Sequence, residues 1–307
     1  MNSASSAVSV ATHPTVAVVI PVYNGERFIR RALDSILRQT HPAAEIVVVD
    51  DGSTDNTREI VAEYGSAVTL LQQQKAGPAK ARNAGVRVTT AEFIAFLDAD
   101  DWWEPAKLEK QLQAFAAHPD AVLNYTGLRM VDEAAGTHKD EPPVAPEVLE
   151  QRLRWMNRNM PPSCVMVRRS AFDQVGGFNE RQIGCEDWCL WFNLRVVGRF
   201  CICAEPLTDY RVSSGGLSGD ATHMFNDFMK MLDDVLLQDL SGLQRMIWRR
   251  RIVSFQAFMA LRTARGAGNK AEEMRYMKKS LLTWPSPFWA PSRFKTFAIT
   301  LLRSGRE

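Results

Sequence analysis

The sequence predicts an α/β fold: a mostly parallel sheet flanked by helices, followed by a helical C-terminal extension. Short apolar runs alternate along the first part of the chain with segments whose apolar residues recur at three- and four-residue steps. Strands that alternate with helices form βαβ units, in which the strands pair in parallel. Polar residues follow the runs directly, and such sheets bind ligands at the carboxyl ends of their strands. The pattern therefore predicts both the fold class and the edge of the sheet that carries a site.

Each element of this fold has its own signal. Apolar, β-branched runs predict strands at 16–20, 45–49, 68–72, 92–97 and 164–168. Helical spacing predicts helices near 28–37 and 79–88, and then at 224–236, 243–262 and 271–282. Prolines mark 133–146 as a surface loop, and Gly215 and Gly216 mark a mobile loop before the later helices.

The composition is that of an intracellular globular protein. The 307 residues are 46% hydrophobic and 23% charged, which allows a core without disulfide staples. The five cysteines lack paired zinc-finger spacing, so we expect buried thiols in a reducing cytoplasm. No run reaches the ~18 apolar residues of a membrane span. Residues 1–15 lack the basic and apolar regions of a secretory signal, so we expect a disordered tail in a cytoplasmic protein.

Charge is distributed unevenly along the chain. The formal net charge is +2, but residues 243–307 contain fourteen Lys or Arg and three Glu, a net of +11, which leaves −9 for residues 1–242. Basic residues beside Trp284 and Trp289 suit an anionic membrane surface, at which the protein would be peripheral. The alternative is a set of helices that pack on the preceding domain with a solvated basic face. No recognised module for nucleic acid accompanies the charge, so we expect no nucleic-acid partner.

Carboxylates follow two of the predicted strands. Asp98 and Asp100, separated by one small residue, are hard oxygen ligands that suit Mg²⁺ or Mn²⁺ bound together with substrate phosphates. Acidic turns at strand ends are common, so this pair alone does not distinguish a metal site from a simple turn. Asp50 and Asp51 add a second pair after the strand at 45–49, at the same edge of the sheet.

Two helix starts complete the candidate site. Lys80, Arg82 and Asn83 lie where donors and the helix dipole favour a diphosphate, or else form a solvated basic face. Glu186 and Asp187 precede an aromatic, apolar segment, and a carboxylate in a cleft wall can accept the proton of a substrate hydroxyl. The alternative for this second pair is a charge pair at the start of a helix.

Taken together, the motifs resemble the family 2 glycosyltransferases with the GT-A fold, a Rossmann-like α/β architecture. The matching segments run in family order over roughly residues 16–215: VVIPVYNGE at 18–26, IVVVDDGSTD at 46–55, GPAKARNAG at 77–85, FIAFLDADD at 93–101, GGF at 176–178 and EDW at 186–188. Each motif alone is weak, but the ordered combination is highly specific.

The resemblance implies inverting transfer of a sugar from a nucleoside diphosphate sugar, with UDP-sugars favoured, to a hydroxyl of a glycan or lipid-linked glycan. Mn²⁺ or Mg²⁺ would assist. Asp187 would be the general base, with Glu186 supporting it. Asp100 would bind the metal, and Asp98 would approach the ribose and the metal. The donor would contact the remaining candidates, Pro21, Tyr23, Asn24, Asp51, Lys80 and Arg82.

The resemblance also implies a domain plan. A catalytic domain at 16–218 would comprise a nucleotide-sugar half at about 16–120 and an acceptor half at about 121–218, before a basic helical extension at 219–307. One position departs from the family pattern, because Ser213 stands where members often carry a histidine that can join the metal shell.

Two other functions stay open: a non-catalytic sugar-nucleotide-binding protein on the same fold, and a nucleotidyltransferase. Retention of Asp100 and Asp187 disfavours the first of these alternatives. The second would want a Gly-rich basic loop directly after the first strand, and Pro21 to Gly25 is not such a loop.

Overall fold

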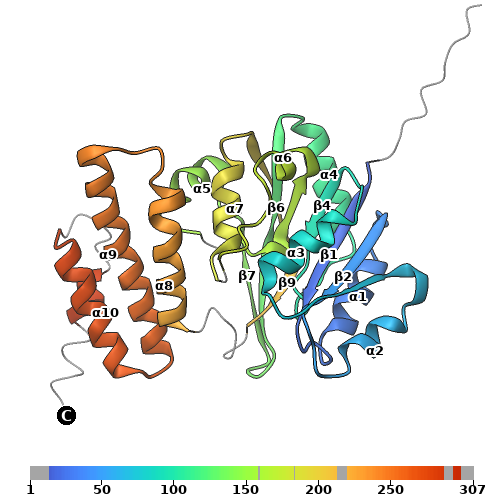
Figure 1. Cartoon of the computed structure of the whole chain (residues 1–307), viewed down its shortest axis with the longest axis horizontal. Helices are drawn as coiled ribbons and strands as arrows, with labels where there is room; N and C mark the ends of the chain where they lie inside the picture. The colour runs from blue at the N-terminus through green and yellow to red at the C-terminus, as the bar shows by residue number, and fades with distance from the viewer. Residues whose placement is uncertain (1–13, 158–159, 183, 213–219, 287–292, 299–307) are drawn as a thin grey trace, which may run out of the picture.

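In the computed structural model of this chain, residues 14–157, 160–182, 184–212, 220–286 and 293–298 are described. Within them the strands form a sheet in the order β3-β2-β1-β4-β8-β6-β9-β5, with β7 added beside β6. Helices flank this sheet, and a further group of helices lies to one side of it (Figure 1). The predicted α/β class is therefore observed.

The part of the chain predicted as the nucleotide-sugar half is built on a parallel sheet. The strands β1 (Val16–Val22), β2 (Glu45–Asp50), β3 (Thr69–Gln72) and β4 (Phe93–Phe96) pair with one another in parallel. The connecting helices are α1 (Ile29–Leu37), α2 (Thr57–Ala62) and α3 (Pro78–Arg87), with a 3-10 turn, η1 (Gly65–Ala67), before β3. Strands β1, β2 and β4 are almost entirely buried because their apolar, largely β-branched residues face helices on both sides of the sheet, whereas β3 is partly exposed. Parallel pairing puts the ends of β1, β2 and β4 at one edge.

Strand β5 (Trp102–Trp103) and helix α4 (Lys107–Ala117) complete the predicted nucleotide-sugar half, and the predicted acceptor half continues the sheet with strands of both directions. The elements of the predicted acceptor half are β6 (Ala121–Asp132), α5 (Pro146–Arg152), η2 (Pro162–Cys164), β8 (Val165–Arg168), α6 (Arg169–Gln174), α7 (Glu186–Leu194) and β9 (Arg199–Arg211). Strand β8 is antiparallel to β4 and β6, whereas β9 is parallel to β6. The last residues of β9 thereby return to the edge where β4 ends.

The prediction of a loop at 133–146 is wrong in part. Residues 133–146 are not a loop throughout, because β7 (Thr137–Glu141) pairs antiparallel with β6 as an edge hairpin. Its residues are polar and largely exposed, so no apolar alternation marked the strand. The prolines at 142 and 143 follow the strand rather than interrupt it.

The extension consists of helices, as predicted. They are α8 (Ala221–Met231), the π-helical turn η4 (Leu232–Leu236), α9 (Gly242–Gly266) and α10 (Lys270–Thr283), and residues 293–298 are also helical. Phe228, Leu232 and Leu261 belong to the same hydrophobic cluster as Trp191 and Leu194 of α7. The extension therefore packs on the acceptor half, which is the alternative that the sequence left open.

Three features predicted from the sequence lie wholly or mostly outside the described residues. They are the tail at 1–15, the Gly215–Gly216 loop and Ser213.

Among the helices that are described, none combines the length and the apolar composition that crossing a membrane requires. The five cysteines are free and mostly buried.

Candidate active site

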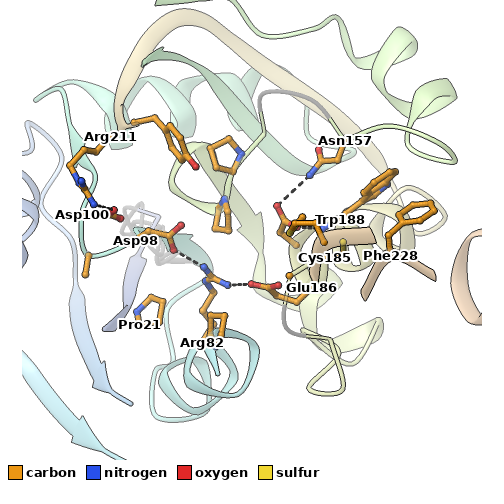
Figure 2. A pocket seen from close by; sticks show the side chains of 18 of the residues that line it. Pro21, Arg82, Asp98, Asp100, Asn157, Cys185, Glu186, Trp188, Arg211 and Phe228 are labelled. Atoms are coloured by element: carbon orange, nitrogen blue, oxygen red, sulfur yellow. Dashed lines mark hydrogen bonds and ion pairs between the residues drawn. The ribbon is translucent and has the colours of Figure 1, made fainter. Parts of the chain in front are cut away.

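A cleft runs from the carboxyl ends of β1 and β4 to the start of α7, with a cavity volume of about 710 Å³ (Figure 2). Most of the candidate residues line it: Pro21, Tyr23, Asn24, Asp51, Arg82, Asp98, Asp100, Glu186 and Asp187. Lys80, Asp50 and Asn83 do not line it, and the side chain of Lys80 is exposed on α3. A role for Lys80 stays a prediction that its position does not support.

The loop after β1 is fastened to the loop after β2. Asn24 has a positive φ of 51°. Its N–H donates to Ser53 Oγ at 2.9 Å, and its Oδ1 accepts from the N–H of Thr54 at 2.8 Å. Tyr23 beside it is half-exposed, and Lys75 Nζ lies 3.6 Å from the centroid of its ring. The left-handed turn thus fixes an aromatic face at the mouth of the cleft.

Asp50 and Asp51 have different hydrogen-bond partners and stabilise different loops. Asp50 is fully buried and accepts from Arg58 Nε at 2.6 Å, which stabilises the loop before α2. Asp51 accepts from Gln73 Nε2 at 2.7 Å and from the N–H groups of Ala76 and Gly77, both at 2.8 Å. A carboxylate has about four acceptor positions, so Asp51 retains one for a ligand while it orders the loop before α3.

Arg82 is the central cation of the cleft. Its Nη1 donates to Glu186 Oε1 at 2.9 Å, and its Nη2 donates to Asp98 Oδ1 at 2.6 Å (Figure 2). Burial disfavours the charge of Arg82, but the two carboxylates outweigh this effect and raise the pKa of the guanidinium. The buried charge is tolerated because it is paired on both sides. Arg82 therefore joins the end of β4 to the start of α7.

Asn83 does not line the cleft, although its position at the helix start suggested a diphosphate contact. Its Nδ2 donates to the carbonyl of Phe178 at 2.9 Å, and its Oδ1 accepts from the N–H of Phe178 at 3.0 Å. Gly177 has a φ of 74°, and a Cβ there would lie 2.8 Å from Asn83 Oδ1. The Gly-Gly-Phe motif is thus a backbone clamp that binds α3 to the acceptor half.

The Asp98–Asp101 loop is held by the end of β9. Arg211 Nη2 donates to Asp100 Oδ2 at 2.6 Å, and the N–H of Arg211 donates to Asp101 Oδ1 at 2.9 Å. Ser163 Oγ donates to Asp101 Oδ2 at 2.6 Å and accepts from the N–H of Asp98 at 3.0 Å. Burial and the charge of Asp98 raise the pKa of Asp100, although Arg211 opposes the shift.

The carboxylates of Asp98 and Asp100 fit a divalent cation that a substrate also coordinates. Among the described residues, no group of three or more His, Cys, Asp or Glu side chains is arranged to hold a metal by itself. Asp98 and Asp100 are both partly exposed in the cleft, and each carries a guanidinium as its present counter-charge. Mg²⁺ and Mn²⁺ sites of this kind use one or two carboxylates together with phosphate oxygens.

Asp187 lies at the start of α7, facing the cleft. Its Oδ1 accepts from the N–H of Trp188 at 2.6 Å, and its Oδ2 accepts from Asn157 Nδ2 at 3.3 Å. Burial and the neighbouring charge of Glu186 raise the pKa of Asp187 to about 7. Burial likewise raises the pKa of Glu186, against the effect of Arg82. A carboxylate that titrates near neutrality is suited to accept a proton.

Comparisons with known proteins identify the family. The sequence profile described as Glycosyl transferase family 2 matches residues 17–176. The putative teichuronic acid biosynthesis glycosyltransferase TuaG of Bacillus subtilis (strain 168) is 32% identical over 212 residues, covering 67% of this chain and 82% of TuaG. The chain is a family 2 glycosyltransferase. The predicted family and enzyme class are confirmed.

Solved structures agree with the fold of this glycosyltransferase. S. aureus TarS 1–349 in complex with UDP-GlcNAc has a TM-score of 0.60 and 19% identity, covering 88% of this chain and 89% of TarS 1–349. The mannosyltransferase PcManGT from Pyrobaculum calidifontis, in complex with GDP-Man and Mn²⁺, has a TM-score of 0.60 and 22% identity, covering 95% of this chain and 86% of its own. The predicted GT-A fold with a helical C-terminal region is confirmed.

Three side chains that hold the cleft residues of this family 2 glycosyltransferase in place are not predicted by the sequence motifs: Arg211, Asn157 and Asp227. Neither Arg211 nor Asn157 lies in one of the motifs that carry the family resemblance. Asp227 of α8 is buried, and its Oδ2 accepts from the N–H groups of Gly184 and Cys185 at 2.8 and 3.2 Å, before α7 begins. A lone acid within an apolar helical pattern was the available signal for Asp227.

Proposed function

We propose that this glycosyltransferase moves a sugar from a nucleoside diphosphate sugar, with UDP-sugars favoured, to a hydroxyl of a glycan or lipid-linked glycan, with inversion at the anomeric carbon. The observation that carries the proposal is the bridge of Arg82 between Asp98 and Glu186. This bridge holds Asp98, proposed to contact the donor, in the same cleft as Glu186 and Asp187, proposed to serve the acceptor. TuaG, whose name assigns it to teichuronic acid biosynthesis, supports a glycan as the product.

The nucleotide would bind at the ends of β1 and β2. Tyr23 offers a ring face for the base, Asp51 has an acceptor position free for a base N–H, and Pro21 and Asn24 complete this wall. TarS 1–349 in complex with UDP-GlcNAc supports a uridine donor, whereas PcManGT in complex with GDP-Man keeps a guanosine donor open. The nucleotide is therefore the first variable to test.

The diphosphate would lie between Arg82 and the Asp98–Asp100 pair. Asp98 and Asp100 would hold a divalent cation, Mn²⁺ or Mg²⁺, together with the diphosphate oxygens, and PcManGT in complex with Mn²⁺ supports this cofactor. When bound, such a cation neutralises negative charge on a phosphate leaving group. Arg82 is permanently charged, and it would orient the leaving group from the opposite side.

Asp187 would act as the general base. It would accept the proton of the acceptor hydroxyl while the hydroxyl oxygen attacks the anomeric carbon and the bond to the diphosphate breaks on the opposite face. One displacement of this kind inverts the anomeric configuration. Glu186 is held by Arg82, and burial together with the charge of Glu186 raises the pKa of Asp187 to about 7.

A donor screen tests the proposal. The full chain is incubated with UDP-, GDP- and dTDP-sugars in the presence of Mn²⁺ or Mg²⁺, with mixed glycan acceptors, and released nucleoside diphosphate is measured. Release with one nucleotide class, lost in Asp187→Asn and on chelation, is the expected result. Binding without release would support the sugar-nucleotide-binding alternative, and release of pyrophosphate would support a nucleotidyltransferase.

The location of the enzyme is a second proposal. Arg275, Lys278 and Leu282 lie at successive positions of one exposed face of α10, and Leu282 is 79% exposed. A basic face with an exposed apolar side chain suits the headgroups of an anionic membrane. The enzyme would then be cytoplasmic and peripheral, and it would meet a lipid-linked acceptor at that surface.

A further inference from the structure

The cleft extends beyond the start of α7 to a wall that the C-terminal helices provide. Figure 2 shows Pro21, Asp98 and Asp100 on one side of the Arg82–Glu186 bridge and Trp188 and Phe228 on the other. From α8 and α9 the lining residues are Ala221, Met224, Phe225, Phe228, Phe255, Gln256, Met259, Ala260 and Thr263. No charged residue occurs in this set of described residues, so the wall offers nothing to bind a phosphate or an acidic sugar.

Two polar groups at this wall form hydrogen bonds within the protein. Gln256 Nε2 donates to the carbonyl of Trp155 at 2.7 Å, and the indole N–H of Trp188 donates to the carbonyl of Leu153 at 2.5 Å. The Trp188 ring packs on Phe228, with centroids 5.1 Å apart. The remaining side chains of the wall are mostly apolar, and Met259 adds a thioether side chain that is still 37% exposed. Such a wall favours binding of a ligand that buries apolar surface against it.

A polar group marks the point where the apolar wall meets the base. Asn157 donates through Nδ2 to Asp187, but its Oδ1 is buried and has no hydrogen-bond partner among the described residues. A buried acceptor left unpaired is costly, and a ligand hydroxyl beside Asp187 would satisfy it. The junction therefore fits a sugar hydroxyl, and the wall beyond it fits an apolar group attached to that sugar.

We propose that the C-terminal helices form an acceptor subsite for the apolar chain of a lipid-linked acceptor, next to the sugar that Asp187 deprotonates. This inference rests on the proposed function, which makes Asp187 the base on the acceptor side. The extension thereby determines the acceptor class: an alkyl-bearing sugar enters the cleft, and its chain lies along α9 between Phe255 and Met259. Packing of the extension on the catalytic part is what creates this specificity.

Binding of alkyl glycosides to the full chain tests the subsite. Methyl, butyl and octyl β-D-glucosides, all below their micellar concentrations, are titrated in the presence of UDP, and binding is measured calorimetrically. We expect affinity to rise with chain length, and octyl glucoside to bind at least tenfold more tightly than methyl glucoside. Met259→Asp, which puts a charge on the wall, should remove most of this chain-length dependence.

A matched variant separates the subsite from a general effect of charge on the helix. Met246→Asp places the same charge on α9 at a methionine that is 51% exposed and lies outside the cleft lining. It should keep the chain-length dependence of the wild type. Equal binding of methyl and octyl glucosides, or equal losses in the two variants, would overturn the subsite. Failure of the proposed function would instead appear in the donor screen, as absence of nucleoside diphosphate release.

Discussion

The guanidinium of Arg82 donates to Glu186 across 104 residues of sequence, at 2.9 Å between Nη1 and Oε1. Arg82 is 3% exposed and Glu186 is 7% exposed, so the contact is a buried link between the two halves of the catalytic part. The same guanidinium holds Asp98 at 2.6 Å. One side chain thus fixes the spacing between Asp98, after β4, and Glu186, the chain neighbour of Asp187.

Removing this cation should destabilise the fold. Arg82→Met leaves Asp98 and Glu186 without their counter-charge, and breaking a buried pair costs ~3–5 kcal/mol. Urea denaturation of the variant and the wild type measures the difference in the free energy of unfolding. Glu186→Gln is the control, because its amide oxygen still accepts from Arg82, and its loss should be smaller. A larger loss in Glu186→Gln than in Arg82→Met would contradict the assignment of Arg82 as the central charge.

Asp187→Asn should lower kcat by ~10²–10⁴. The amide is nearly the same size as the carboxylate but cannot accept the proton of the acceptor. Donor affinity should change little, because the role proposed for Asp187 is a contact with the acceptor and not with the donor. Steady-state kinetics and titration of the donor check the two statements separately. Near-normal turnover would move the base elsewhere, with Glu186 as the first candidate.

The pH profile should have an ascending limb near pH 7. The pKa of Asp187 is raised to about 7 by burial and by Glu186, so below that pH the carboxyl is protonated and cannot accept a proton. The value of kcat/KM should therefore fall as the pH decreases through 7 and level off above it. Glu186→Gln removes a negative charge that raises this pKa, so the limb should move to lower pH. An unchanged limb in that variant would show that another group titrates.

Asp100→Ala should abolish donor turnover and Mn²⁺ binding while the thermal unfolding temperature stays close to that of the wild type, since Asp100 is partly exposed in a cleft. Mn²⁺ binding is followed by electron paramagnetic resonance. Arg211→Ala removes the cation that now pairs with Asp100 at 2.6 Å. A partly exposed pair contributes ~0.5–1 kcal/mol, so in the absence of donor this variant should bind Mn²⁺ about two- to fivefold more tightly. Full activity of Asp100→Ala after chelation would refute metal dependence.

Vesicle co-sedimentation tests the membrane proposal. The full chain should pellet with vesicles that contain phosphatidylserine at low salt and be released at high salt. Arg275→Glu/Lys278→Glu should stay in the supernatant, whereas Arg38→Glu/Arg199→Glu, with the same change of charge on exposed residues elsewhere, should still pellet. Point variants are preferred to removal of residues 243–307, because α9 contributes Phe255 and Leu261 to the core. If the wild type stays soluble, the basic extension serves packing alone.

Local signals predicted most of the nucleotide-sugar half. The runs at 16–20 and 45–49 are strands because their β-branched residues pack on both faces of a buried parallel sheet. Asp98 and Asp100 follow β4, and parallel pairing alone brings them to the edge where β1 and β2 end. In the acceptor half the signals were weaker, since the exposed strand β7 shows no apolar alternation.

Side chains that act at a distance could not be predicted in this way. Position at a helix start suggested a diphosphate contact for Lys80 and Asn83, but Lys80 points to solvent and Asn83 clamps the backbone of Phe178. Lys80 and Asn83 lie on the same short helix, α3, as Arg82. The orientation of α3 about its own axis, relative to the sheet, decides which of the three side chains enters the cleft. The spacing of residues along the helix does not predict that orientation.

The sequence by itself determined the family, the parallel edge of the sheet and the carboxylates that gather there, because these depend on residues that are close along the chain. The tertiary structure decided which partner each carboxylate has. Arg211 reaches Asp100 only because β9 runs back parallel to β6, and the α9 wall reaches the cleft only because apolar residues of α8 and α9 pack on α7. Such contacts follow from the packing of distant elements, whose free energy depends on all the surfaces that are buried together.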